Sequence, residues 1–184
     1  MEVETLTLPS SPEDAIESLE ALDLELVCLP MFEDLRPPRG LAAWIDWRTD
    51  GWLSRLLGSE RFEPVSGGRL LTPVARTGWA TGAVLIGQGP WSAWDDARAR
   101  AYIDEARAAT RDLSVSRVGL EVPRWTTPGG ESERGEAGHV GDLEDPGGIS
   151  RIQEMAREGW GAVTTSTPVR LRLIVSDFDA ASPR

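Results

Sequence analysis

The sequence contains no lysine and no asparagine, and it has one histidine, His139, and one cysteine, Cys28. A zinc site built from these residue types needs three or four ligands, so one of each is too few. Without lysine the chain has no Schiff-base nucleophile and no phosphate-loop lysine. A single cysteine excludes an internal disulfide, and a reducing cytoplasm is the expected compartment. Polar chemistry is left to carboxylates, arginines and hydroxyls, and we expect no metal and no cofactor.

Length and composition indicate a globular protein. The 184 residues, of which 40% are hydrophobic, suffice for one domain with a core, so residues 1–184 are interpreted as a single domain. No apolar run approaches the roughly 20 residues that cross a bilayer, and no membrane contact is expected. The exclusive use of arginine for positive charge is interpreted as the mark of a GC-rich bacterial genome.

The negative charge is concentrated at the start of the chain. Residues 1–35 carry ten carboxylates and no arginine, whereas residues 36–184 carry twenty acidic residues and nineteen arginines. Such a distribution repels nucleic acid, so nucleic-acid binding is excluded. The acidic run is interpreted mainly as a solvated helix face, with a docking surface for an arginine-rich partner as the alternative.

Strand-like and helix-like hydrophobic patterns alternate along the chain. Strands are expected at residues 3–8, 24–32, 69–74, 83–86, 117–122 and 169–175. Helices are expected from residue 12, over 41–57, over 93–113 (capped by Ser92 and Asp95, with Trp94, Ala97 and Ala101 inward) and from 149 to near Gly159. Residues 124–148, rich in Gly, Pro and Glu, are interpreted as a mobile acidic loop, and 177–184 as a short tail. This order predicts an α/β fold with three layers, in which helices flank a mostly parallel central sheet.

Five segments, taken in order, resemble a known family. They are 26–34 (LVCLPMFED), 45–57 (IDWRTDGWLSRLL), 62–71 (FEPVSGGRLL), 83–89 (AVLIGQG) and 149–161. Their order and spacing resemble the N-terminal domain of the leucyl aminopeptidase family, the M17 peptidases. The resemblance extends over residues 20–176 and implies a macro-domain-like fold.

The same resemblance implies that catalysis is absent. In that family the zinc ligands and catalytic residues belong to a C-terminal domain that has no counterpart here. Its signature, Asn-Thr-Asp-Ala-Glu-Gly-Arg, requires an asparagine, which this sequence does not contain. Val65 and Ser66 stand where the family has the lysine of a glycine turn. We therefore expect a protein that is not an enzyme.

A glycine turn follows the strand expected at 83–86. In the sequence Gly87-Gln88-Gly89-Pro90-Trp91, backbone N–H groups between a strand and a helix could hold a phosphate. The resemblance points the same way, because macro-like folds often bind ADP-ribose or nucleotides. Pro90 lacks an N–H group, however, and the acidic residues at 95 and 96 repel phosphate. Gly87, Gln88, Gly89 and Trp91 are a candidate ligand site, with an ordinary structural turn as the preferred interpretation.

Tryptophan is abundant, with eight residues in the chain. Trp44, Trp47 and Trp52 cannot all point along one narrow stripe of a single helix. Tryptophan is enriched at interface hot spots, so Trp44, Trp47, Trp91 and Trp94 are predicted to form a contact surface, with core packing as the equal alternative.

Two other reactive side chains are interpreted as structural. Cys28 lies in the apolar segment 24–32 and is expected to be a buried small hydrophobe. His139 lies near Asp142, Glu144 and Asp145, whose spacing does not match a calcium loop, and a solvated loop is expected there.

Three functions remain open at this point. The first is a non-enzymatic interaction, scaffold or regulatory module that associates with a protein partner or with itself. The second is a sensor for a small ligand, a nucleotide or ADP-ribose, at Gly87–Trp91. The third is an accessory subunit or remnant of a zinc aminopeptidase.

Overall fold

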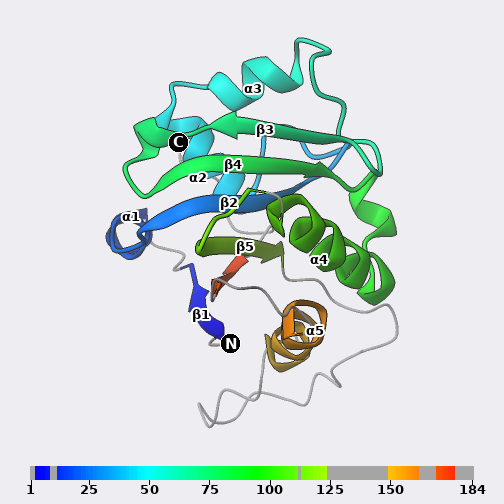
Figure 1. Ribbon diagram of the computed structural model, residues 1–184. Helices are drawn as coiled ribbons and strands as arrows, with labels where there is room; N and C mark the ends of the chain where they lie inside the picture. Colours follow the sequence, from blue (N-terminus) through cyan, green and yellow to red (C-terminus); the bar gives the residue numbers. More distant parts are fainter. Residues whose placement is uncertain (1–2, 9–11, 112, 124–148, 162–168, 177–184) are drawn as a thin grey trace, which may run out of the picture.

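The computed structural model of the protein describes residues 3–8, 12–111, 113–123, 149–161 and 169–176 (Figure 1). The expected loop 124–148, the tail 177–184 and His139 lie outside the described residues. The strands are β1 Val3–Thr7, β2 Leu24–Met31, β3 Arg69–Pro73, β4 Ala80–Gly87, β5 Arg117–Pro123 and β6 Arg170–Ser176. The helices are α1 Pro12–Glu20, α2 Gly40–Arg48, α3 Trp52–Leu57, η1 Ala75–Thr77, η2 Trp91–Ala93, α4 Asp96–Arg111 and α5 Ile149–Gly161.

The six strands form one mixed sheet in the order β1-β6-β5-β2-β4-β3. All neighbouring strands are parallel except β3, which pairs antiparallel with β4 at one edge. The predicted α/β class with a mostly parallel sheet is thus confirmed. That residues 1–184 form a single domain stays a prediction.

Helices cover both faces of the sheet, giving the three predicted layers (Figure 1). One hydrophobic cluster joins the sheet to α4 and α5 and includes Tyr102, Ile103 and Ile152. The other joins it to α1, α2 and α3 and includes Leu41 and Leu53. Because both faces are covered, β2 is a nearly unbroken buried run, as expected for a central parallel strand.

The helix expected over 41–57 is two helices. The hydroxyl group of Thr49 donates to the carbonyl oxygen of Ile45 (2.7 Å) at the end of α2, and Gly51 adopts a left-handed backbone with φ 73°. The carboxylate of Asp46 then accepts hydrogen bonds from the N–H (2.8 Å) and hydroxyl (2.6 Å) of Ser54 in the first turn of α3. These local bonds stop one helix and start the next, which hydrophobic spacing alone does not reveal.

The helix expected over 93–113 begins later, at Asp96, after the short turn η2. The Asp95 carboxylate, and not Ser92, accepts from the N–H of Arg98 (2.8 Å). Trp94 is buried but precedes the helix, so counting helical turns from it gives the wrong face. Ala97 and Ala101 are exposed. The inward residues of α4 are Ala99, Tyr102, Ile103, Ala106 and Thr110.

Gly159 does not stop the last helix, which continues to Gly161. A Cβ atom at position 159 would lie 2.7 Å from the Cγ2 atom of Ile103. The glycine therefore serves the close packing of α5 against α4, and not the end of a helix.

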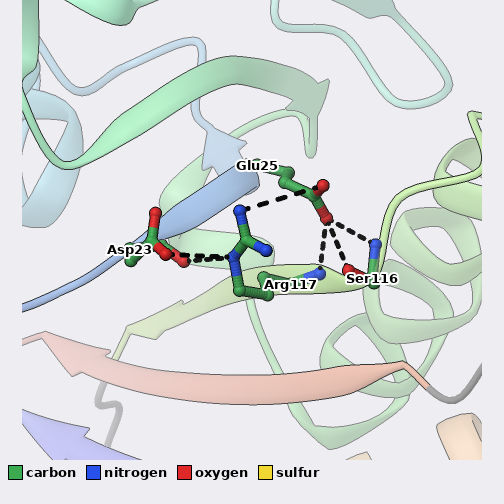
Figure 2. Close-up of polar contacts among 4 residues, drawn as sticks. All are labelled: Asp23, Glu25, Ser116 and Arg117. Atoms are coloured by element: carbon green, nitrogen blue, oxygen red, sulfur yellow. Dashed lines mark hydrogen bonds and ion pairs between the residues drawn. The ribbon is translucent and has the colours of Figure 1, made fainter.

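A carboxylate anchors β2 to the start of β5 (Figure 2). The side chain of Glu25 accepts hydrogen bonds from the N–H (2.6 Å) and hydroxyl (2.9 Å) of Ser116 and from the N–H of Arg117 (2.9 Å). The Arg117 guanidinium also donates to the carbonyl oxygen of Asp23 (2.9 Å). The hydrogen bonds from Ser116 and Arg117 hold the pKa of Glu25 below its usual value of 4.5.

We expect Glu25→Gln to lower Tm at pH 7 by about 2–4 °C, as the loss of one charge-assisted hydrogen bond near the surface would in a chain of this size. Because the folded-state pKa of Glu25 is lowered, its contribution is present above pH 4.5 and is lost as the pH falls through the folded value. Calorimetry from pH 7 to pH 3 should show the two proteins converging at the acid end. Glu158→Gln, which removes an exposed ion pair with Arg100, is the control, and an equal effect in both variants would contradict the anchor.

Candidate functional site at the carboxyl edge of the sheet

The parallel strands β1, β2, β4, β5 and β6 end at the same edge of the sheet. In open α/β sheets, ligands bind outside these carboxyl ends. The loop between β2 and α2, the glycine turn after β4, and the last residues of β5 and β6 meet here. Any site that follows the general rule for this architecture belongs at this edge.

The glycine turn uses every one of its backbone N–H groups within the protein. These groups donate from Gly87 to Gly68 O (2.8 Å), from Gln88 to Met31 O (2.8 Å), from Gly89 to Pro64 O (2.9 Å) and from Trp91 to an Asp34 carboxylate oxygen (2.7 Å). Pro90 has no N–H group. The carbonyl oxygen of Gln88 accepts from the Arg98 guanidinium (2.6 Å), and the Gln88 side chain is buried. The predicted phosphate-holding donors at Gly87, Gln88, Gly89 and Trp91 are therefore already occupied.

Gly87 lacks a side chain for a structural reason. A Cβ atom there would lie 2.1 Å from the carbonyl oxygen of Val65 and 2.7 Å from the carbonyl carbon of Pro64. The segment 64–68 packs directly on the turn, and Ser66 accepts a hydrogen bond from Arg98 (3.2 Å). Segment 64–68 thus covers the glycine turn on its outer side.

The four tryptophans of the predicted contact surface do not share one surface. Trp94 is 6% exposed and packs, with the half-buried Trp91, in the cluster on the α4 and α5 side. Phe32 meets both rings edge-on, at 4.9 Å from Trp91 and 5.2 Å from Trp94. Trp44 is 9% exposed and belongs to the other cluster. Trp44 and Trp94 are core residues because each fills the interior between the sheet and a helix layer.

Trp47 is the most exposed member of that set, at 44%. Its ring stands edge-on to Trp44 at 5.9 Å, and the Arg48 guanidinium lies 5.4 Å from the ring centre. A groove of about 380 Å³ runs beside it, lined by Pro37, Pro38, Ala43, Asp46, Trp47, Asp50 and Gly51. We call this the Trp47 groove. Its lining combines prolines, an alanine and a tryptophan with two carboxylates.

Glu121, near the carboxyl end of β5, is the residue that sequence reasoning missed. It is fully buried, and its Oε1 atom accepts from the Leu41 N–H at the start of α2 (2.5 Å) and from the Ser176 hydroxyl at the end of β6 (2.5 Å). Its Oε2 atom is buried and has no hydrogen-bond partner among the described residues. Burial raises the pKa of Glu121 to about 7, against the two hydrogen bonds, which lower it.

This carboxylate occupies the position an external anion would take. A helix N-terminus carries a partial positive charge and unpaired N–H groups, and α2 has no capping side chain from its own Arg39. Glu121, from strand β5, supplies the capping acceptor for α2. The sequence carries a signal: after Arg117 at the start of strand Arg117–Pro123, Glu121 is the one charged residue among apolar ones, and a charge in the middle of such a run is rare enough to mark a special position.

The remaining candidates are structural within the described residues. Cys28 is buried, as predicted, and burial raises the pKa of its thiol to about 12, so it stays protonated. The Tyr102 hydroxyl donates to the Cys28 carbonyl oxygen (2.9 Å). In the part of the chain that the structure describes, no group of three or more His, Cys, Asp or Glu side chains could hold a metal ion. None of the described helices is long and apolar enough to span a membrane.

No family model and no curated protein matches this sequence. Solved structures do match. A tomato leucine aminopeptidase mutant aligns with a TM-score of 0.56 and 12% identity over 100% of this chain and 34% of that chain. The macrodomain of Thermus aquaticus DarG aligns with 0.56 and 9% identity over 94% of this chain and 97% of that chain. The macrodomain of Mycobacterium tuberculosis DarG aligns with 0.53 and 11% identity over 86% and 92%.

These structural alignments show a common fold. This chain spans about a third of the length of the aminopeptidase, in its N-terminal region, and nearly the full length of both macrodomains. The expected macro-domain-like fold is therefore confirmed: the chain has the α/β fold that macrodomains and the N-terminal region of leucine aminopeptidase share.

Proposed function

We propose that this chain is a non-enzymatic, macrodomain-like interaction module that binds a protein partner at the Trp47 groove. The observation that carries the proposal is the contrast between two places. At the carboxyl edge, Asp34 and Glu121 occupy the N–H groups of Trp91 and Leu41 that could receive a ligand phosphate. At the groove, a tryptophan ring is left 44% exposed beside two prolines.

The charge of the groove defines the partner chemistry. Asp46 is engaged with Ser54, and Asp50 with Arg76 at 3.3 Å in a pair that is mostly exposed and therefore weak. A basic side chain of a partner can replace such a pair, while an apolar or aromatic neighbour packs on Trp47 and Pro38. We infer a partner segment in which an arginine or lysine adjoins a large apolar residue. The chain's net charge of −11 favours approach of such a segment.

Trp47→Ala is expected to weaken the complex at least about 30-fold, because a buried interface tryptophan contributes roughly 2 kcal/mol or more. Tm should fall only moderately, since Trp47 is 44% exposed although its ring packs edge-on against Trp44. Affinity purification from native extract, followed by identification of bound chains, is the measurement, with sedimentation for self-association. Leu71→Ala is the matched control, because Leu71 is 54% exposed on β3. Equal recovery of bound chains by both variants would contradict the proposal.

Titration calorimetry with ADP-ribose, ADP and ATP distinguishes the interaction module from the alternative, a sensor for a small ligand. The interaction module predicts no heat from any of them. If one of these ligands gives a binding heat that is lost in Trp91→Ala and unchanged in Trp47→Ala, the proposal is wrong. The chain would then bind a small ligand at the carboxyl edge.

A further inference from the structure

A second pocket lies at the opposite, amino edge of the sheet. It has a volume of about 230 Å³ and lies between the end of α1 and the first residues of β5 and β6. Three arginines line it, Arg117, Arg170 and Arg172, together with the carboxylates Glu4 and Asp23. Leucines 22, 24 and 171 form its apolar part. In a chain that carries eleven more negative than positive charges, three guanidinium groups around one pocket need an explanation.

The strand register forces the arginines together. Arg117 of β5 is the direct partner of Arg170 of β6, so two positive side chains stand side by side on neighbouring strands. Arg172 follows two residues later on the same face. Like charges in such cross-strand positions repel each other. An anion between them would turn the repulsion into attraction.

The carboxylates nearby pair with two of the three arginines and leave the third without an ion pair among the described residues. Arg117 pairs with Asp23 at 3.4 Å, where Asp23 is 88% exposed, and Arg172 pairs with Glu4. Glu25 lies 3.9 Å from Arg117, outside the pocket lining, so its negative charge falls on an arginine that Asp23 already pairs (Figure 2). Among the described residues, Arg170 pairs with no carboxylate.

We propose that this pocket binds an oxyanion, a phosphate or a carboxylate group, with Arg170 as its principal ligand. Guanidinium groups bind such oxyanions through paired N–H donors. The apolar part of the pocket strengthens the attraction, because charges interact more strongly where water is partly excluded. The site is independent of the Trp47 groove, which lies beside α2, and either can fail without the other.

The test is calorimetric unfolding in sodium phosphate and in sodium acetate, each against sodium chloride at equal ionic strength. At ten times its Kd, a bound anion should raise Tm by roughly 3–6 °C. Arg170→Gln is expected to weaken anion binding at least about tenfold and to lose most of the shift. Arg76→Gln is the matched control, because Arg76 is an exposed arginine that pairs with Asp50 and does not line the pocket.

Each outcome of this test either assigns the ligand class or overturns the proposal. A shift in phosphate alone that Arg170→Gln removes assigns a phosphate ligand, and a shift in acetate that Arg170→Gln removes assigns a carboxylate ligand. Phosphate also stabilises proteins by exclusion from their surface, and that effect is the same in both variants. Equal shifts in Arg170→Gln and Arg76→Gln, or no shift beyond that of chloride, would overturn the proposal.

Discussion

Replacing Glu121 by alanine should lower the free energy of unfolding at pH 7 by about 3 kcal/mol and Tm by about 6–12 °C. The substitution leaves the Leu41 N–H and the Ser176 hydroxyl, both held by Oε1, without an acceptor in the interior. Each unsatisfied donor costs roughly 1–3 kcal/mol, and the empty volume adds to the loss. The substitution also removes the cost of burying a charged carboxylate, which offsets part of this loss of stability. Chemical unfolding followed by tryptophan fluorescence measures the difference.

Glu121→Gln separates the hydrogen bonds from the charge. The amide oxygen still accepts from Leu41 and Ser176, but the side chain no longer titrates. Since the pKa of Glu121 is raised from 4.5 to about 7 on folding, its contribution to stability is full below pH 4.5 and is lost as the pH rises to about 7. The loss amounts to about 3 kcal/mol. The glutamine variant should therefore match the wild type near pH 4.5 and exceed it in stability at pH 8.

The control for this pair is Ser176→Ala, which removes one donor to Oε1 and leaves the other. It should still show a pH dependence, displaced to higher pH than in the wild type, because the carboxylate remains buried and loses a hydrogen bond that lowers its pKa. If Glu121→Gln had the same dependence of stability on pH as the wild type, the charge of Glu121 would not be the cause. The alanine and glutamine variants together then distinguish a cap for α2 from a titrating group.

Local hydrophobic patterns in the sequence predict most of the strands and helices of the fold. The apolar runs at β2, β4 and β5 and the periodic segments at α4 and α5 were placed within a few residues, because strands and helices of this length have strong periodicities. The errors arose where one side chain changes the backbone. Thr49 and Gly51 split a helix, and Asp95 delayed another, through hydrogen bonds and φ values that hydrophobic spacing does not record.

The candidate site was harder to predict because its state depends on distant partners. The N–H groups of Gly87, Gln88 and Gly89 looked available in sequence, yet their acceptors lie at positions 68, 31 and 64. Glu121 is separated from Leu41 by 80 positions and from Ser176 by 55. These contacts follow from the topology, and the one indication in the sequence is a charged residue, Glu121, within the apolar part of β5. The exposure of Trp47 and the burial of Trp44 likewise depend on which faces the sheet covers.

Gly87→Ala should be comparably damaging, lowering the free energy of unfolding by about 3 kcal/mol through overpacking. Its new Cβ atom would lie 2.1 Å from the Val65 carbonyl oxygen and 2.7 Å from the carbonyl carbon of Pro64. Both are backbone atoms, so rotation of a side chain cannot relieve the clash. The segment 64–68 must move, and the bonds from Gly87 to Gly68 and from Gly89 to Pro64 weaken with it.

Gly58→Ala is the matched control, because it adds the same methyl group at an ordinary helical backbone, φ −84°, with its nearest atoms at 3.5 and 3.7 Å. It should be neutral or stabilise the chain by about 0.5–1 kcal/mol by restricting the unfolded state. Urea unfolding of both variants measures the contrast. Equal stability of the two would mean that segment 64–68 does not pack on the glycine turn. The N–H groups of Gly87 and Gly89 would then be open to a phosphate, whereas those of Gln88 and Trp91 would still donate to Met31 and Asp34, so a ligand at the glycine turn would become a stronger alternative to a partner at the Trp47 groove.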